Sequence, residues 1–512
     1  MTNGRRNRLP QRTLAALTLL SLLPLPLAAQ KLPPEQRAAR YMEKVRHQPS
    51  LLLAFIAQMP KGGDLHNHLF GAVYAESYIQ WAAQDGLCVQ RASMSLVEPP
   101  CDPAAGKLPA SQALSDPTLY AQLVDAFSMR DWNAARDSGH DHFFNSFFKF
   151  DAVTSHHIGD MLADAAELAA DDHVSYLELM LAPDGNRAIQ MGERLGWTEN
   201  FAQMRQKLLA GGLPEVIAAA RKSLDEEEAR MRQDLRCGHP GARPGCQLTL
   251  RYLYQVLRGL PPEQVFAQIL TGFELAQADP RVVGLNLVMP EDWYVPMRDF
   301  HLHMKMVDYL HGLYPRVHIS LHAGELWDGL VPPQGLSFHI RDSVETGHAE
   351  RIGHGVDVMR ETDPIGLLQE LARRNVLVEI CLTSNDLILG VRANEHPLPV
   401  YLQYGVPVAL ATDDEGVSRS DMNHEYLRAA ESYGLGYRRL KEMARASLEH
   451  SFLPGPSLWK DARRFRVVDA CAPDSPAASA LSPACRRFLR SSERAQAQWR
   501  VEEEFGRFEA RF

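Results

Sequence analysis

Residues 350–385 read ERIGHGVDVMRETDPIGLLQELARRNVLVEICLTSN and contain two apolar runs separated by a helical pattern. Each apolar run, at 350–357 and at 376–385, ends in polar residues. Between them, residues 363–375 repeat apolar side chains at the spacing of one helix face. A strand, a helix and a second strand of this kind form the repeating unit of a parallel sheet that helices cover.

The same unit recurs on both sides of this stretch. Helical patterns, such as the one at 296–313, separate most of the β-type runs, of which there are eight. They lie at 63–69, 174–183, 247–257, 281–292, 316–325, 350–357, 376–385 and 407–414. Eight alternating units predict an α/β fold, a closed (β/α)8 TIM barrel whose active site lies at the carboxyl ends of the strands.

Three further segments lie outside a minimal barrel. Residues 30–58 predict an N-terminal helical segment, and residues 85–150 form a long insertion after the first strand. Residues 455–512 form a C-terminal helical extension with one charged helix, RRFLRSSERAQAQWRVEEEFGRF. The barrel, with its insertion, is expected to occupy residues 59–454.

The composition is that of an ordinary globular protein. The chain has 512 residues, of which 45% are hydrophobic and 23% charged, so disorder, collagen-like repeats and a small disulfide scaffold are excluded. Its 54 Lys and Arg against 63 Asp and Glu give a net charge of −9. This balance does not favour binding to nucleic acid or to an anionic membrane.

The N-terminus has the layout of a secretory leader. Four arginines between residues 5 and 12 precede an apolar run at 13–27, which ends at Ala28-Ala29. We expect residues 1–29 to be a signal peptide, and the mature protein to be periplasmic or secreted. The alternative is an uncleaved anchor, but the run contains two prolines and is shorter than the roughly 20 residues that span a bilayer.

Export affects how the seven cysteines are interpreted. Cys381 lies in an apolar run, where a buried thiol is more common than a nucleophile. Several connectivities are open for the other six, but short polar loops in an oxidising compartment favour pairing between neighbours, with free thiols as the alternative. The neighbouring pairs are Cys88 with Cys101, Cys237 with Cys246, and Cys471 with Cys485.

Three His-x-His pairs occur, and local structure decides which of them can bind a metal. On a strand, residues i and i+2 point to the same face, whereas on a helix they diverge. His301 and His303 lie in a helical pattern, and His140 and His142 are expected in a polar loop, so neither pair is expected to bind metal. The remaining pair, His66 and His68, lies on the strand-like run at 63–69 and forms a candidate metal site.

Further polar residues end other predicted strands. His322 ends the run at 316–325 and is followed by Glu325, while His354 lies near the end of 350–357. Asp413 and Asp414 end the last run. Strand ends of a barrel converge, so four groups of metal-ligand type would meet at one mouth. These four are His66, His68, His322 and Asp413.

Five motifs resemble, in order and spacing, the motif series of the adenosine deaminase family of zinc-dependent barrels, within the amidohydrolase superfamily. They are MPKGGDLHNHLFGA (59–72), HAGE (322–325), RIGHGVD (351–357), EICLTSN (379–385) and ATDD (411–414). The leader, the insertion and the cysteine pairs resemble the secreted, growth-factor-like branch of that family.

The resemblance implies one Zn²⁺ per chain, held by His66, His68, His322 and Asp413, which activates a water molecule for attack on C6 of a purine. It implies that His354 orients this water and accepts its proton. Glu325, kept neutral in a dry pocket, would protonate ring N1, and Asp414 would hydrogen-bond N7. Adenosine, and deoxyadenosine as well, would yield the inosine product and ammonia.

The implied partner is a small-molecule purine nucleoside, with neither nucleic acid nor membrane bound by the mature form. Whether the chain is a monomer or a homodimer stays open. Two other functions also stay open. One is deamination of another 6-aminopurine compound, although a nucleotide would require basic residues near the pocket. The other is a binding or signalling relative without catalysis, which the intact set of candidate residues disfavours.

Two positions depart from the family pattern. Phe70 stands where the family usually has an aspartate that meets the ribose. Met289, followed by Pro290, stands where a strand-four glycine approaches the purine. Glu291 or Asp292 could supply the missing sugar contact. The metal chemistry is unaffected, and weak discrimination between sugars is expected.

Overall fold

The eight apolar runs form eight parallel strands in the computed structural model, which describes residues 1–4, 32–476 and 480–512. Their order in the sheet follows their order in the chain. The strands are β1 (Gly62–His68), β5 (Val174–Leu181), β6 (Thr249–Leu257), β7 (Val282–Val288), β8 (His318–Ala323), β9 (Arg351–His354), β10 (Leu377–Ile380) and β11 (Val408–Leu410).

The first and last strands meet, which closes the sheet into a barrel. The backbone N–H of Asp413 donates to the carbonyl of His66 at 2.9 Å, and the N–H of His68 donates to the carbonyl of Asp413 at 3.1 Å. Asn67 and Asp413 form a parallel bridge at the same place. The predicted (β/α)8 TIM barrel is confirmed, and residues of the candidate site lie on its closing seam.

Helices cover the outside of the barrel, as the alternating pattern predicted. For example, Asp363 caps the helix expected at 363–375 by accepting from the N–H of Gly366, and Leu367, Leu368 and Leu371 are buried against the sheet side. These helices are α7 (Ile158–Asp171), α8 (Arg187–Leu195), α9 (Phe201–Ala210), α10 (Leu213–Asp234), α11 (Pro262–Ala278), α12 (Tyr294–Leu313), α13 (His339–Glu345), α14 (Pro364–Arg374), α15 (Leu382–Leu389), α16 (Leu398–Tyr404), α17 (Glu415–Ser418), α18 (Met422–Ser432) and α19 (Tyr437–Glu449).

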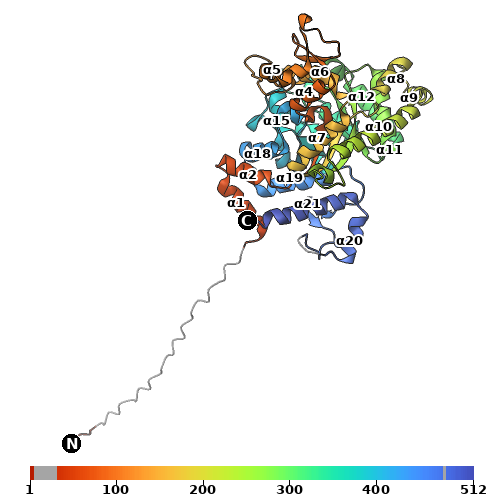
Figure 1. Ribbon diagram of the computed structural model, residues 1–512. Coiled ribbons are helices and arrows are strands. Elements are labelled where there is room, and N and C mark those ends of the chain that lie inside the picture. Colours follow the sequence, from red (N-terminus) through yellow and green to blue (C-terminus); the bar gives the residue numbers. More distant parts are fainter. Residues whose placement is uncertain (5–31, 477–479) are drawn as a thin grey trace.

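The segment after β1 adds a small sheet and several helices at one end of the molecule (Figure 1). His140 and His142 lie in its last helix rather than in the predicted loop, because Ser138 caps that helix by accepting from the N–H of Asp141 at 3.2 Å. The added elements are α3 (Leu69–Ala72), α4 (Ala75–Gln84), α5 (Pro117–Phe127) and α6 (Gly139–Thr154), with an antiparallel sheet of β2 (Cys88–Gln90), β3 (Ser95–Val97) and β4 (Lys107–Pro109).

The helical segment that begins at residue 34 and the C-terminal tail pack together at the opposite end of the folded body (Figure 1). The tail forms two helices where one was predicted. Ser492 starts the second by accepting from the N–H of Ala495 at 3.0 Å, so the serine pair breaks the charged run. Phe55 and Phe508 join these two segments, with ring centroids 5.0 Å apart. The terminal elements are α1 (Pro34–Val45), α2 (Pro49–Ala57), β12 (Trp459–Asp461), β13 (Arg466–Val467), α20 (Pro483–Arg490) and α21 (Glu493–Glu509).

The disulfide prediction is confirmed. Cys88 is bonded to Cys101, Cys237 to Cys246 and Cys471 to Cys485, and Cys381 is a buried thiol. Within the described residues, no helix is both long enough and apolar enough to cross a membrane. The predicted signal peptide at 1–29 falls, beyond residue 4, outside the described residues.

Candidate active site

The four predicted ligand groups converge at the carboxyl ends of β1, β8 and β11. One ligand atom from each of His66, His68, His322 and Asp413 lies within 4.8 Å of all the others. The Nε2 atoms of His68 and His322 are 3.1 Å apart, and Asp413 Oδ1 lies 3.4 Å from His66 Nε2 and 3.3 Å from His68 Nε2. Such close approach of three imidazoles and a carboxylate is the geometry of a metal site.

The imidazole of His66 is aimed at this cluster by a buried carboxylate. Its Nδ1 lies 2.7 Å from Glu379 Oε2, and Arg351 Nε lies 2.6 Å from the other oxygen of Glu379. Its Nε2 is buried and has no hydrogen-bond partner among the described residues. A buried imidazole nitrogen without a partner is costly, so the missing partner is best supplied by a ligand such as a metal ion.

The other ligands are held in the same way. His322 Nδ1 lies 2.8 Å from Asn286 Oδ1, which leaves its Nε2 free for the cluster. Ser384 donates to Asp413 Oδ2 at 2.6 Å. Sequence reasoning missed Glu379, Asn286 and Ser384. A signal was present for the first two, because a polar residue interrupts an apolar strand in both VLVEI (376–380) and GLNLV (284–288).

Glu325 lies on the loop after β8, which a second carboxylate shapes. Glu291 accepts from the backbone N–H groups of Gly324 at 3.1 Å and of Glu325 at 2.8 Å, and pairs with His339 at 2.6 Å. Burial raises the pKa of Glu325 well above its usual range, and the charges of Asp413 and Glu291 add to the increase. The raised pKa favours the neutral carboxylic acid form of Glu325, which can donate a proton.

His354 and Asp414 complete the set of predicted residues around the cluster. His354 Nε2 lies 3.7 Å from Glu325 Oε1 and has no hydrogen-bond partner among the described residues. Asp414 Oδ1 is equally unpartnered, and a Cβ on Gly71 would lie only 1.6 Å from it. A glycine at 71 therefore makes the room in which the Asp414 carboxylate fits. All seven predicted site residues meet at one mouth of the barrel.

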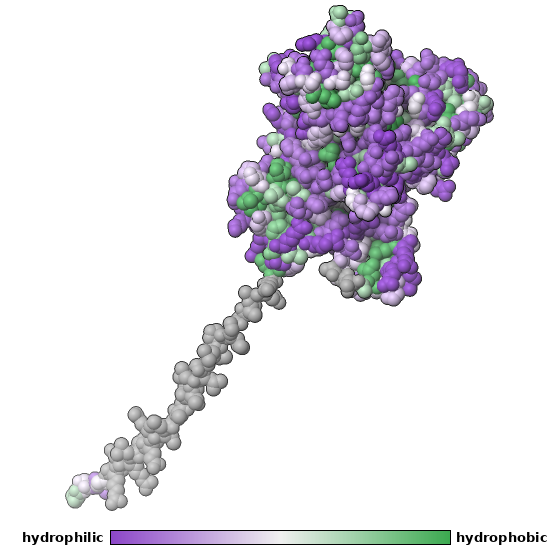
Figure 2. Space-filling model, in the orientation of Figure 1, coloured by the Kyte–Doolittle hydropathy of each residue, from purple (hydrophilic) through white to green (hydrophobic). Residues whose placement is uncertain are grey.

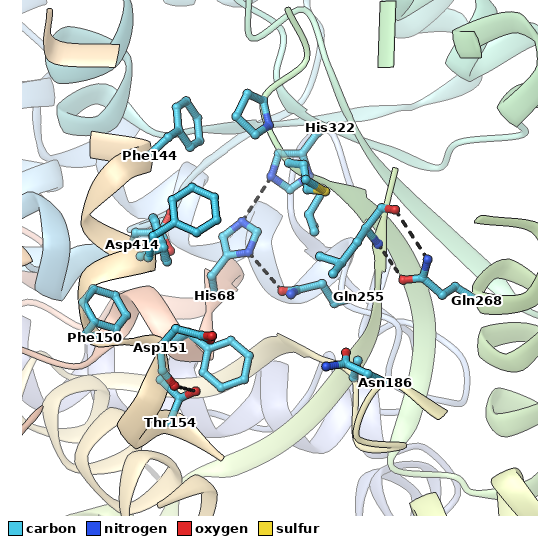
Figure 3. A pocket seen from close by; sticks show the side chains of 18 of the residues that line it. His68, Phe144, Phe150, Asp151, Thr154, Asn186, Gln255, Gln268, His322 and Asp414 are labelled. Atoms are coloured by element: carbon cyan, nitrogen blue, oxygen red, sulfur yellow. Dashed lines mark hydrogen bonds between the residues drawn. The ribbon is translucent and has the colours of Figure 1, made fainter. Parts of the chain in front are cut away.

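A cavity of about 570 Å³ opens above these residues. Its wall on one side is α6, which contributes Phe143, Phe144, Phe147, Phe148 and Phe150. Figure 3 shows Phe144 and Phe150 on the side of Asp414, with Gln255 across the pocket. Figure 2 shows apolar residues interspersed with polar ones at the end of the molecule that carries α5 and α6. A cavity with polar groups at its floor and aromatic walls is typical of a small-molecule site.

The two departures from the family pattern both line this cavity. Phe70 places an apolar ring beside His68. Met289 has a φ of +87°, a backbone conformation that favours glycine, and its side chain lines the pocket. Glu291 and Asp292 are not among the residues that line the cavity. Glu291 holds the Glu325 loop and Asp292 pairs with His140, so both carboxylates have other partners, and a sugar contact from either stays a prediction.

The pair of His140 and Asp292 fastens the aromatic helix α6 to the loop after β7. His140 Nε2 lies 2.9 Å from Asp292 Oδ1, and His140 Nδ1 lies 2.9 Å from Asp141 Oδ1. Burial opposes protonation of His140, but the hydrogen bonds to Asp292 and Asp141 outweigh it and raise the pKa of His140 above 6.5. This pair ties the wall of the cavity to the barrel, and the raised pKa means that the tie favours the protonated imidazole.

Replacing His140 with glutamine should destabilise the protein more at about pH 5.5 than at about pH 9, by about 1 kcal/mol. A raised histidine pKa stabilises the folded state below pH 6.5, and this contribution is lost as the pH rises through the raised value. Urea unfolding at both pH values measures it. His301→Gln, at an exposed pair with Asp342, is the control and should show little difference between the two pH values. Equal destabilisation of His140→Gln at both pH values would contradict the charged tie.

The sequence and the fold were compared with known proteins. A sequence model of the adenosine deaminase family matches residues 118–460. An adenosine deaminase of Salmonella typhimurium is 37% identical over 154 residues, which cover 30% of this chain and 42% of the relative. An aminodeoxyfutalosine deaminase of Streptomyces coelicolor is 35% identical over 147 residues, which cover 27% of this chain and 34% of the relative. The matches thus span less than half of these relatives.

Solved structures share the fold at lower identity. An amidohydrolase from Burkholderia ambifaria with bound Zn has a TM-score of 0.52 at 16% identity, covering 89% of this chain and 95% of that one. The N6-methyl-AMP deaminase of Arabidopsis thaliana has a TM-score of 0.50 at 18% identity, covering 80% and 96%. The family match extends over most of the chain and includes His322, Glu325, His354, Asp413 and Asp414. The chain belongs to the adenosine deaminase family of the amidohydrolase superfamily.

Proposed function

We propose that this protein is an exported, zinc-dependent adenosine deaminase. The observation that carries the proposal is the meeting of the four ligand atoms with Glu325, His354 and Asp414 at the floor of one cavity. The metal-ligand group, a proton donor and a purine-binding carboxyl group are thus within reach of one small molecule. Hydrolysis of a purine amine requires these three functions.

Zinc suits this donor set best. Three imidazoles and one carboxylate are borderline donors in the number that zinc prefers, and the unpartnered Nε2 of His66 is directed at the same point. When bound, zinc supplies a Lewis acid that activates water at neutral pH. His66, His68, His322 and Asp413 would hold it, one ion per chain.

The remaining residues act on the purine and on the attacking water. Glu325, whose neutral form is favoured because burial raises its pKa, donates its proton to ring N1 and makes C6 more electrophilic. The N7 atom of a purine accepts hydrogen bonds, so Asp414 must carry a proton to bind it. Burial, together with the charge of Asp413, raises the pKa of Asp414 and so favours this protonated form. His354 contacts the attacking water through Nε2.

The cavity favours a nucleoside over a nucleotide. None of the described residues that line it is a lysine or an arginine, while Glu98 and Asp151 lie at its wall. A phosphate group would meet carboxylates there without a cation to offset its charge. The aromatic side chains of α6 suit a purine ring, since bases stack on aromatic faces. A neutral substrate such as adenosine fits this lining.

A substrate screen tests this function. Adenosine and deoxyadenosine should be deaminated with kcat/KM values within about tenfold of each other, because Phe70 cannot accept a hydrogen bond from a sugar hydroxyl. AMP should react at least about 10²-fold more slowly, since its phosphate lacks a cationic partner. The loss of absorbance that accompanies deamination gives the rates. A preference for AMP, or for one sugar by about 10²-fold, would contradict this choice of substrate.

The disulfides support export. Three disulfides form and persist in an oxidising compartment and are rare where thiols are kept reduced. We propose that the protein acts outside the cytosol, with its leader at 1–29 removed. The N-terminal sequence of the protein recovered from the periplasm or the medium tests the cleavage. A start at Met1 in that fraction would rule it out.

A further inference from the structure

Three hydrogen bonds in series connect the backbone of α16 to His354. The direction of the first bond is fixed, because its donor is a backbone N–H. The backbone N–H of Leu398 donates to His396 Nδ1 at 3.1 Å. A backbone N–H cannot accept, so His396 Nδ1 must use its lone pair. His396 is 2% exposed, and burial lowers its pKa to about 3, so the ring is neutral. Its hydrogen therefore sits on Nε2.

The direction of the first bond determines the second and the third. His396 Nε2 lies 3.0 Å from Asn385 Oδ1, so its N–H donates to that oxygen. The amide of Asn385 then has its Nδ2 towards His354, and Nδ2 lies 2.9 Å from His354 Nδ1. An amide nitrogen can only donate, so His354 Nδ1 accepts. The usual ambiguity of an asparagine amide is resolved here because the chain starts at a backbone donor.

The last ring nitrogen of the chain faces the active site. With Nδ1 accepting, neutral His354 carries its hydrogen on Nε2. That atom is buried, lies 3.7 Å from Glu325 Oε1 and has no hydrogen-bond partner among the described residues. The backbone φ of His354 is +69°, a left-handed conformation that is strained for a residue other than glycine. The strained backbone conformation thus fixes where the imidazole of His354 lies, and its Nε2–H faces the cavity.

We propose that His396, acting through Asn385, fixes His354 in the tautomer that donates from Nε2 to the attacking oxygen. The assignment of that oxygen rests on the proposed deaminase function. In this tautomer His354 orients the oxygen and has no free lone pair with which to take its proton, so that proton would pass to solvent before the attack, as a metal that lowers the pKa of bound water to about 7 would allow. This differs from the role of proton acceptor that the family resemblance implied. His396 and Asn385 are positioning residues, since neither lines the cavity.

Reversing the polarity of the middle link gives the sharpest test. In Asn385→Asp the carboxylate can only accept, so His354 should carry its hydrogen on Nδ1 and turn a lone pair to the cavity. Spectra of ¹⁵N-histidine-labelled, zinc-loaded protein distinguish the two tautomers, with the His354 signals identified by their loss in His354→Ala. We expect the hydrogen on Nε2 in the wild type and on Nδ1 in Asn385→Asp. The hydrogen on Nδ1 in the wild type would overturn the proposal.

Activity provides an independent readout that does not depend on that substitution folding well. His396→Phe keeps an aromatic ring but removes the donor, and should lower kcat by about 10- to 100-fold with zinc content unchanged. His396→Gln restores a donor to Asn385 Oδ1 and should recover at least about half of that loss on a logarithmic scale. His303→Phe makes the same change at another buried histidine, on α12, and is the control for replacing a buried imidazole with a phenyl ring. Equal rates in His396→Phe and the wild type would overturn the proposal.

The outcome is separable from that of the proposed function. If the wild type deaminates no 6-aminopurine, the proposed function fails, yet the spectra still report which nitrogen of His354 carries hydrogen. If the wild type deaminates adenosine and Asn385→Asp retains the wild-type tautomer, the proposed function stands and the hydrogen-bond chain does not control His354.

Discussion

Removal of the metal should abolish deamination of adenosine, lowering the rate by at least about 10³-fold, and zinc should restore it. A Lewis acid contributes several kcal/mol to the stabilisation of the transition state, and each 1.36 kcal/mol is a factor of about ten in rate. The assay is a rate measurement before chelation, after it, and after titration with zinc, together with the metal content of each sample. Full activity in a metal-free sample would rule out the proposed chemistry.

Two adjacent aspartates provide a matched pair of variants for this test. Asp413→Asn removes a predicted ligand and should lower both zinc content and activity. Asp414→Asn changes its neighbour, which lies outside the four-atom cluster, and should lower activity while zinc stays bound. Both side chains are buried at the same strand end, so a general effect of the substitution would appear in both. Equal zinc contents in the two variants would contradict the ligand assignment.

Glu325→Gln should lower kcat by at least about 10²-fold while zinc stays bound, because the amide cannot transfer a proton to the ring. Glutamine is close to isosteric with the buried glutamate that it replaces, so the fold should be retained. Glu345→Gln, at a surface pair with Arg341, is the control and should keep the wild-type rate. A Glu325→Gln rate within about threefold of the wild type would mean that another group protonates the purine.

The barrel and its metal cluster were predictable because both depend on local patterns. Strand residues two apart share a face, so His66 and His68 could be predicted to bind one ion. The pair at His301 and His303 lies on the helix α12, as predicted, where such residues diverge. Strand ends converge in a parallel barrel, so His322 and Asp413 could be predicted as the other two ligands. These inferences need only the order of the strands and the alternation of side chains.

The supporting contacts were less accessible because they join residues that are distant in sequence. Nothing in the spacing of Glu379 and His66, or of His140 and Asp292, indicates that they meet. The helix at His140 was missed because its phenylalanines are spread over several faces: Phe143 and Phe150 are buried in the core and also line the cavity, whereas Phe148 is exposed. In the tail, the helical pattern continues through Ser491 and Ser492. The structure nevertheless ends α20 at Arg490, and Ser492 caps the start of α21.

The metal cluster lies on the seam where the barrel closes, and this affects how the protein can fold. The strand β1 is synthesised early and β11 hundreds of residues later. His66 and His68 therefore cannot meet Asp413 until the last barrel strand has docked. Joining the two requires closure of the longest loop in the barrel, and until then both strands have unpaired edges that can aggregate. An ion that binds only the closed form stabilises it by mass action. A metal ion would therefore stabilise the closed barrel only after all of its strands have been assembled.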